Sequence, residues 1–313
     1  MPETKLAFGD KELIVKTTPN KKDEILDSFF RKLSILIVLS IGFIIAVVII
    51  PYPVKLLPQL LLGMMFAHSI ELEHELTHHI IFFNERVNRL VGTLLGLPML
   101  VSFSLYKALH GHHHSVLGTP EDKETFNYNY EKLTSISGFI LHLSMLGHYS
   151  GVVENICATL VGKLREDVSP KIAHRIRNEY CLIVCLIIIM LVLSILWQTT
   201  ILLDTWLIPL IIFTGPIHAL IELPEHFGCD NQTTNPFHNT RTIQASKFLI
   251  WYVNGNNYHI EHHFNPALPI NELRNYHSTI VGKIENLESS YWSFYKKFFD
   301  KLFSKKSLSL ENN

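Results

Sequence analysis

The sequence predicts an all-α, multi-pass membrane protein, with about four transmembrane helices and a cytoplasmic, histidine-rich helical cap. Charged residues make up only 18% of the 313 residues, and 48% are hydrophobic. Soluble domains carry roughly 25% charged residues. The apolar residues come in long blocks, and many of the 18 histidines are clustered. The formal net charge of −1 gives no indication of nucleic-acid binding.

Four apolar blocks are long enough to cross a bilayer. Residues 33–50 contain no charged residue, and 18 residues of helix about span the hydrocarbon core. The Pro-Tyr-Pro turn that follows leads into a second span at 54–72, which carries a single lysine before its polar end. The third span is expected at 181–197 and the fourth at 202–221, with prolines as kinks in the fourth.

The basic residues orient these spans. The N-terminal segment 1–32 carries seven Lys and Arg, and the segment before the third span carries five more. By the positive-inside rule, both chain ends and the histidine clusters are cytoplasmic, in a bacterial inner membrane or the endoplasmic reticulum. The membrane domain is expected over 33–280. The tail, 281–313, mixes aromatic residues with lysines, so we expect it to be interfacial or cytoplasmic.

Two further stretches are apolar but interrupted. Residues 87–103 contain an arginine and three helix breakers, and residues 134–162 contain two histidines and a glutamate. Only 30 residues separate His79 from His110, too few for two crossings of about 20 residues each. If the histidine clusters meet, 87–103 must dip into the membrane and return, or lie flat. By the same argument, 134–162 is expected to form interfacial helices.

Three histidine clusters repeat one spacing. Each cluster has a His followed by another four positions later, and the second and third also have one at plus three. Positions i, i+3 and i+4 share one face of a helix, so each cluster aims its imidazoles at one point. The clusters are His74, His78 and His79, then His110, His113 and His114, then His259, His262 and His263.

The repetition favours a metal centre over a solvated polar surface. Imidazole ligation suits Fe, Zn, Cu or Ni. Eight or nine imidazoles exceed the three protein ligands of a catalytic zinc, but they suffice for two metals with open positions. His112 falls outside the spacing pattern. Isolated histidines are expected to have structural or surface roles: His68, His142, His148, His174, His238 and His277.

These three boxes on a four-span pattern resemble the integral-membrane fatty acid desaturase superfamily, with its related hydroxylases and carotenoid ketolases. The resemblance covers roughly residues 55–280. Smaller stretches agree with it: "GTPEDKE" at 118–124, "ELPEHFGC" at 222–229, "NTRT" at 239–242 and "FNPALPINELRNYH" after the third box. The resemblance implies a cytoplasmic di-iron centre held by histidines, with one further ligand between the last span and the third box. His226 stands at that position.

The resemblance also implies roles for individual residues. The ligand set is His74, His78, His110, His113, His114, His226, His259, His262 and His263, with His79 and His112 less clearly members. Glu222 stands where stearoyl-type enzymes have Asn, so it could be a further ligand or could accept a hydrogen bond from one. Metal-bound histidines usually donate their other N–H to a carboxylate or carbonyl. Candidates for that role are Glu71, Glu75, Asp122, Glu225 and Glu261, and Arg241 is expected to pair with one of these acids.

The expected function is O₂-dependent desaturation of an acyl lipid or acyl-CoA, with two Fe ions as cofactor. The inner ends of the spans and residues 87–103 would line an acyl tunnel. The sequence has no haem-binding H-P-G-G and no Rieske motif. Electrons would therefore come from a separate donor of ferredoxin or cytochrome b5 type.

Two alternatives remain at this point. Hydroxylation or ketolation of a lipid or carotenoid belongs to the same superfamily, and sub-ångström substrate placement decides between these outcomes. The other alternative is a membrane zinc metalloprotease, because His74-Glu75-x-x-His78 matches H-E-x-x-H with Glu75 as general base. That reading leaves the second and third clusters unexplained.

Overall fold

The computed structural model describes residues 19–78, 81–82, 84–119, 121–122, 126 and 130–310. The helices in chain order are α1 (Pro19–Ile49), α2 (Leu56–Thr77), α3 (Glu85–Gly96), α4 (Phe103–Val116), α5 (Ile136–Leu143), α6 (Leu146–Leu160), α7 (Pro170–Leu196), α8 (Gly215–His226), α9 (Pro236–Asn239), α10 (Lys247–Tyr252), α11 (His259–Phe264), α12 (Ile270–Ile280) and α13 (Tyr291–Leu310). Two-residue strands, β1 (Thr242–Ile243) and β2 (Leu287–Glu288), pair in parallel. The all-α prediction is confirmed.

In the part of the chain that the structure describes, three helices are long and apolar enough to cross a membrane: 23–49, 170–196 and 203–226. They match the first, third and fourth predicted spans. Large apolar side chains on α1 and α7 face outward, for example Val38 at 67% exposure and Ile195 at 65%. Such exposure suits contact with lipid. The protein is therefore an integral, multi-pass membrane protein.

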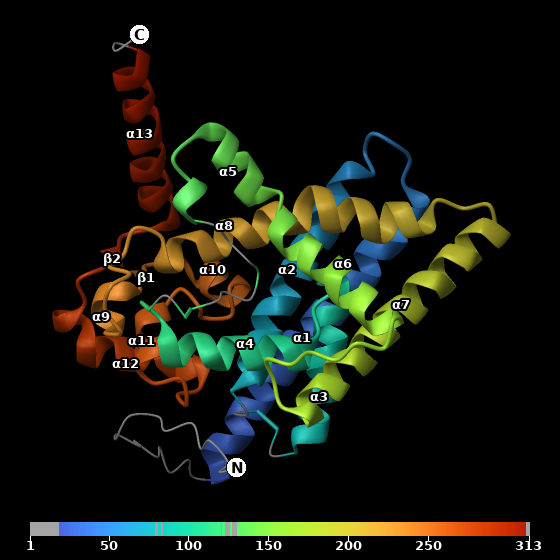
Figure 1. The fold of residues 1–313 in the computed structure, drawn as a ribbon, viewed down its shortest axis with the longest axis horizontal. Coiled ribbons are helices and arrows are strands. Elements are labelled where there is room, and N and C mark those ends of the chain that lie inside the picture. The colour runs from blue at the N-terminus through green and yellow to red at the C-terminus, as the bar shows by residue number, and fades with distance from the viewer. Residues whose placement is uncertain are drawn as a thin grey trace.

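The second predicted span differs from the other three. Residues 56–77 form helix α2, but α2 is not among the three apolar spans. Most of its residues are buried inside the protein, and Figure 1 shows it at the centre of the helices. Three glutamates and a histidine in its last two turns lower its hydropathy. This helix therefore serves mainly as a core element that carries polar groups into the interior.

The two interrupted stretches form bent helix pairs. The first pair, residues 85–99 and 103–116, bends by 95°, and the second, α5 and α6, bends by 41°. The first bend follows Pro98 and passes through Leu100, whose φ of 61° is left-handed. Ser102 then starts α4, with its side chain accepting a hydrogen bond from the Leu105 N–H. Each pair is apolar enough to count as one broken span or a re-entrant segment.

The fourth span is irregular where prolines were expected to kink it. Residues 203–207 and 209–214 form π-helical turns, and α8 begins at Gly215 with Pro216 in its first turn. Gly63 of α2 packs against these turns. A Cβ at Gly63 would lie 2.6 Å from Phe213 Cβ and 3.1 Å from the Pro209 carbonyl oxygen. Only glycine allows this approach of α2 to the fourth span.

The C-terminal helix α13 projects from the body of the protein (Figure 1). Its apolar residues Phe294, Phe298 and Leu302 are buried against Leu133 and Leu223. Trp292, on the other hand, is 78% exposed. One face of α13 therefore packs on the protein near the end of α8, as an amphipathic helix does.

Candidate metal centre

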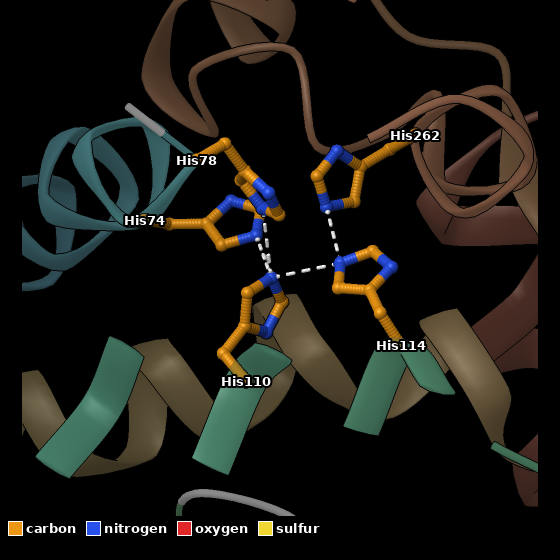
Figure 2. Close-up of side chains that lie close together, drawn as sticks. All are labelled: His74, His78, His110, His114 and His262. Carbon is orange, nitrogen blue, oxygen red and sulfur yellow. Dashed lines mark hydrogen bonds between the residues drawn. The ribbon is translucent and has the colours of Figure 1, made fainter. Parts of the chain in front are cut away.

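Five imidazoles from three helices converge on one point, as Figure 2 shows. They are His74 and His78 at the end of α2, His110 and His114 on α4, and His262 on α11. The Nε2 atom of His110 lies 2.7 Å from Nε2 of His74 and 3.0 Å from Nε2 of His114. Two imidazole nitrogens bound at right angles to one ion at about 2.1 Å lie about 3.0 Å apart. The spacing therefore fits ligation of a common metal.

A second set of imidazoles lies beside the first. It contains His113, His226 and His263, whose ligand atoms lie within 4.8 Å of one another. His259 joins this set, since its Nε2 atom lies 3.1 Å from Nε2 of His226 and 3.2 Å from Nε2 of His263. The Oε2 atom of Glu225 lies 3.2 Å from the same His259 nitrogen. Glu225 is thus placed as a possible carboxylate ligand.

The two sets share helices because of the i, i+3, i+4 spacing. On α4, His110 and His114 face the first set while His113 faces the second, and α11 divides its histidines in the same way. The rings of His114 and His263 stack with centroids 4.2 Å apart, which joins the two sets. The structure thus brings nine histidines together: His74, His78, His110, His113, His114, His226, His259, His262 and His263.

A tight turn delivers α11 to this position. Gly255, between α10 and α11, has a φ of 81°, and a Cβ there would lie 2.6 Å from Ile270 Cγ2. Asn254 and Asn256 on either side are buried and anchor the turn to α2. The Asn256 amide donates to Glu71 Oε2 at 2.6 Å, and the Asn254 amide donates to Glu75 Oε2 at 3.0 Å. These asparagines were not among the sequence-derived candidates.

Two of these imidazoles use Nδ1, the ring nitrogen that does not face the histidine set, for a hydrogen bond to the protein. Nδ1 of His113 lies 2.9 Å from Asp122 Oδ1, the contact expected of Asp122. Nδ1 of His226 lies 3.1 Å from the Asn239 carbonyl oxygen. A proton on Nδ1 that is bound in this way leaves Nε2 as the atom available to a metal. Both contacts therefore fix ring orientation.

Glu261 supports α11 without contacting a ligand imidazole directly. Its Oε2 accepts a hydrogen bond of 2.6 Å from the Thr242 hydroxyl, and its Oε1 lies 2.5 Å from Nδ1 of His277. Glu261 is fully buried, so these two partners satisfy a carboxylate that solvent does not reach. His277, expected to have only a structural or surface role, holds this carboxylate from α12.

Two expectations about charged residues differ from the structure. Among the described residues, Arg241 pairs with no acid; its guanidinium donates to the backbone carbonyls of Pro224 and Phe227 and lies 4.9 Å from the Phe294 ring centroid. The reason is that α8 ends there and leaves carbonyls without helical partners. Glu75 binds Asn254 rather than lying beside the metal-binding imidazoles, so its position gives no support to a protease base.

Glu222 faces His218 one turn earlier on α8. Its Oε1 atom lies 3.4 Å from Nε2 of His218, and Glu71 Oε1 lies 3.8 Å from Nδ1 of the same ring. His218 is fully buried. His218 was not among the candidates from the sequence, although its i, i+4 spacing to Glu222 could have signalled the contact.

Burial keeps the α11 imidazoles in the form that binds metals. It lowers the pKa of His259, His262 and His263 well below the usual value of 6.5, and the neighbouring imidazoles lower each pKa further. A neutral imidazole has a lone pair for a metal, whereas an imidazolium has none. A cavity of about 40 Å³ also opens between the histidine sets, beside Tyr106, Phe126 and Glu222. This space holds water-sized molecules.

The sequence matches the family model described as "Fatty acid desaturase" over residues 51–295. The chain belongs to the fatty acid desaturase family. The match extends slightly beyond the region of resemblance inferred from the sequence, and it includes all three histidine boxes. Membership makes the protein a lipid oxidoreductase of the desaturase and hydroxylase type. The histidine sets of this desaturase-family protein are thus in a position to bind metal.

The remaining histidines that the structure describes lie apart from the two sets. His79 falls outside the described residues. His112 is exposed, and its Nε2 lies 3.3 Å from the Glu121 carbonyl oxygen. His68, His142 and His148 are buried, each with a ring nitrogen within 3.2 Å of a backbone carbonyl oxygen. His238 lies 2.6 Å from Glu285, and His174 is exposed. The contacts of His68, His142 and His148 therefore hold the scaffold of this protein.

Proposed function

We propose that the protein is a di-iron, O₂-dependent desaturase that introduces a C=C bond into a fatty acyl chain. The observation that carries the proposal is the convergence of nine histidines in two adjoining sets. One zinc takes about three protein ligands, so these sets exceed the needs of a hydrolytic zinc. Two irons with open positions account for the number and type of ligands.

Five imidazoles would hold one iron and four the other, with Glu225 beside the second. Bound iron supplies, with O₂ and electrons, the oxidising power that side chains lack for breaking an unactivated C–H bond. The chain's own residues do the rest. The 40 Å³ cavity limits the space beside the metals to small molecules, and Asp122 and the Asn239 carbonyl hold two ligand rings in place.

Electrons would come from a separate protein of ferredoxin or cytochrome b5 type. The two motifs that mark a fused donor domain in such enzymes are missing from the sequence. The basic segments near the first and third spans would make the cytoplasmic face positive and attract an acidic donor. We propose that the histidine sets and both chain ends lie on this cytoplasmic face of the membrane.

Lipid profiling of a host that expresses the protein tests the proposal. We expect new unsaturated acyl chains with the wild type and none with His262→Ala, while His112→Ala behaves as the wild type. Hydroxylated or keto products would assign the other reaction class of the superfamily. An unchanged lipid profile with a metal-loaded protein and a competent electron donor would contradict the proposal.

A further inference from the structure

Three cavities adjoin one another along helix α4. A groove of about 480 Å³ lies between α3, α4 and the start of α7, and a cavity of about 200 Å³ lies between α4, α6 and α7. Leu109 lines both of them. Tyr106 and Phe126 line the second cavity and also the 40 Å³ cavity between the histidines. The groove, the cavity and the space between the histidines therefore lie next to one another along α4, with Leu109, Tyr106 and Phe126 at their shared boundaries.

The groove combines an apolar lining with cationic groups. Phe103 and Ile172 are among its apolar residues, and Arg89, Lys107 and Arg175 line it as well. Its two carboxylates are both neutralised. Glu85 pairs with Arg175, and Asp167 pairs at 2.5 Å with Arg165, which lies outside the groove. Arg89 also lies 4.0 Å from Glu179, which is outside the groove. With these outside partners counted, the cations still exceed the carboxylates by one, so the region carries a small positive charge.

The groove lies at one end of a membrane span. Residues 170–196 are a candidate span, and Arg175 and Ile172 belong to the first two turns of its helix α7. The end of a span is the level at which lipid head groups meet the hydrocarbon core. Apolar walls with a few cations at that depth suit an amphiphile that enters from the membrane.

We propose that this groove binds the phosphodiester head of a membrane phospholipid and that one acyl chain passes under Leu109 toward the metals. The proposal rests on the proposed function and names its substrate class as a phospholipid-bound acyl chain. A phosphodiester carries one negative charge, which matches the small positive charge of the groove. The several phosphate charges of acyl-CoA would leave negative charge unpaired there.

Two aromatic rings separate the acyl cavity from the metals. The ring centroids of Tyr106 and Phe126 lie 5.7 Å apart, and that of Tyr106 lies 5.7 Å from that of His110. Tyr106 is only 4% exposed. The two rings mark the boundary between the space for the chain and the histidine sets, and the methylene that reaches this boundary is the one nearest the metals.

Lipid binding to the full-length protein in detergent micelles tests the groove directly. The probe is a fluorescent phosphatidylglycerol, displaced by unlabelled phosphatidylglycerol, diacylglycerol or stearoyl-CoA. We expect phosphatidylglycerol to displace it best. Lys107→Gln should weaken binding about fivefold, the loss expected for one cation near a lipid head group. Exposed Lys163 lies outside the groove, so Lys163→Gln serves as the matched control and should bind as the wild type.

A second variant tests the connection between the cavities. Leu109→Trp should close the passage, so it should abolish unsaturated products and weaken probe binding while retaining the metal content of the wild type. Lys163→Gln should retain both the products and the probe binding of the wild type. If Lys107→Gln leaves probe binding unchanged, or if stearoyl-CoA displaces the probe best, the phospholipid assignment is overturned. Unsaturated products from the wild type would still leave the proposed function intact. Absence of unsaturated products from every acyl substrate would instead refute the proposed function.

Discussion

Replacing Asp122 with alanine should weaken metal binding at the second histidine set. Asp122 is 15% exposed, and its Oδ1 lies 2.9 Å from Nδ1 of His113. Loss of a carboxylate that orients a ligand imidazole typically costs 10- to 100-fold in metal affinity, which is about 1.4–2.7 kcal/mol. Asp122→Asn keeps a neutral acceptor. A neutral hydrogen bond contributes about 1 kcal/mol less than a charged one, so we expect about a fivefold loss for that variant.

The assay is retention of iron by the purified protein against increasing chelator, with iron counted per chain. Asp230→Ala is the matched control. Asp230 is exposed, and its side chain accepts a hydrogen bond only from the nearby Gln232 N–H among the contacts described. We expect the order wild type and Asp230→Ala, then Asp122→Asn, then Asp122→Ala. If Asp122→Ala retains both irons as tightly as the wild type, the contact with His113 has no role in metal binding.

Three further predictions follow from the same geometry. Metal analysis should show that His113→Ala loses at least one metal equivalent while His112→Ala retains both. Equal losses would contradict the structure of α4, in which His113 faces the second histidine set and His112 faces solvent. Gly63→Ala should destabilise the fold by about 1–3 kcal/mol, because its Cβ would lie 2.6 Å from Phe213 Cβ; an unchanged denaturation midpoint in mixed micelles would be the contrary result. The metal-free protein should lose stability as the pH falls below about 6.5, because the α11 histidines of the unfolded chain bind protons that the folded chain excludes. Each of these histidines contributes up to about 1.4 kcal/mol of lost stability per pH unit. Thermal unfolding at pH 5.5 and 7.5 checks the sign: the unfolding temperature should be lower at pH 5.5.

Much of this arrangement could be predicted from the sequence because it depends on local helical spacing. The three boxes follow from positions i, i+3 and i+4. The first and third spans follow from uninterrupted apolar runs, and the fourth follows from an apolar run that contains two prolines. His226 could be found only through the family resemblance, since a single histidine carries no spacing signal. Its place beside His259 depends on how α8 packs against α11.

Other features depend on tertiary packing and could not be predicted. The sequence of α2 is typical of a span, but its neighbours bury it, and two of its three glutamates bind asparagines from the turn before α11. Arg241 was expected to pair with an acid, yet it binds carbonyls at the end of α8. The division of the histidines into two sets also required the helices to be placed relative to one another.

The metal content of the purified wild-type protein tests the central claim most directly. We predict two irons per chain after expression with sufficient iron, and a loss of at least one of them in His262→Ala. Elemental analysis by mass spectrometry, normalised to protein by amino-acid analysis, gives the number. A single zinc per chain, or two irons that persist in His262→Ala, would contradict a centre built from the three histidine boxes.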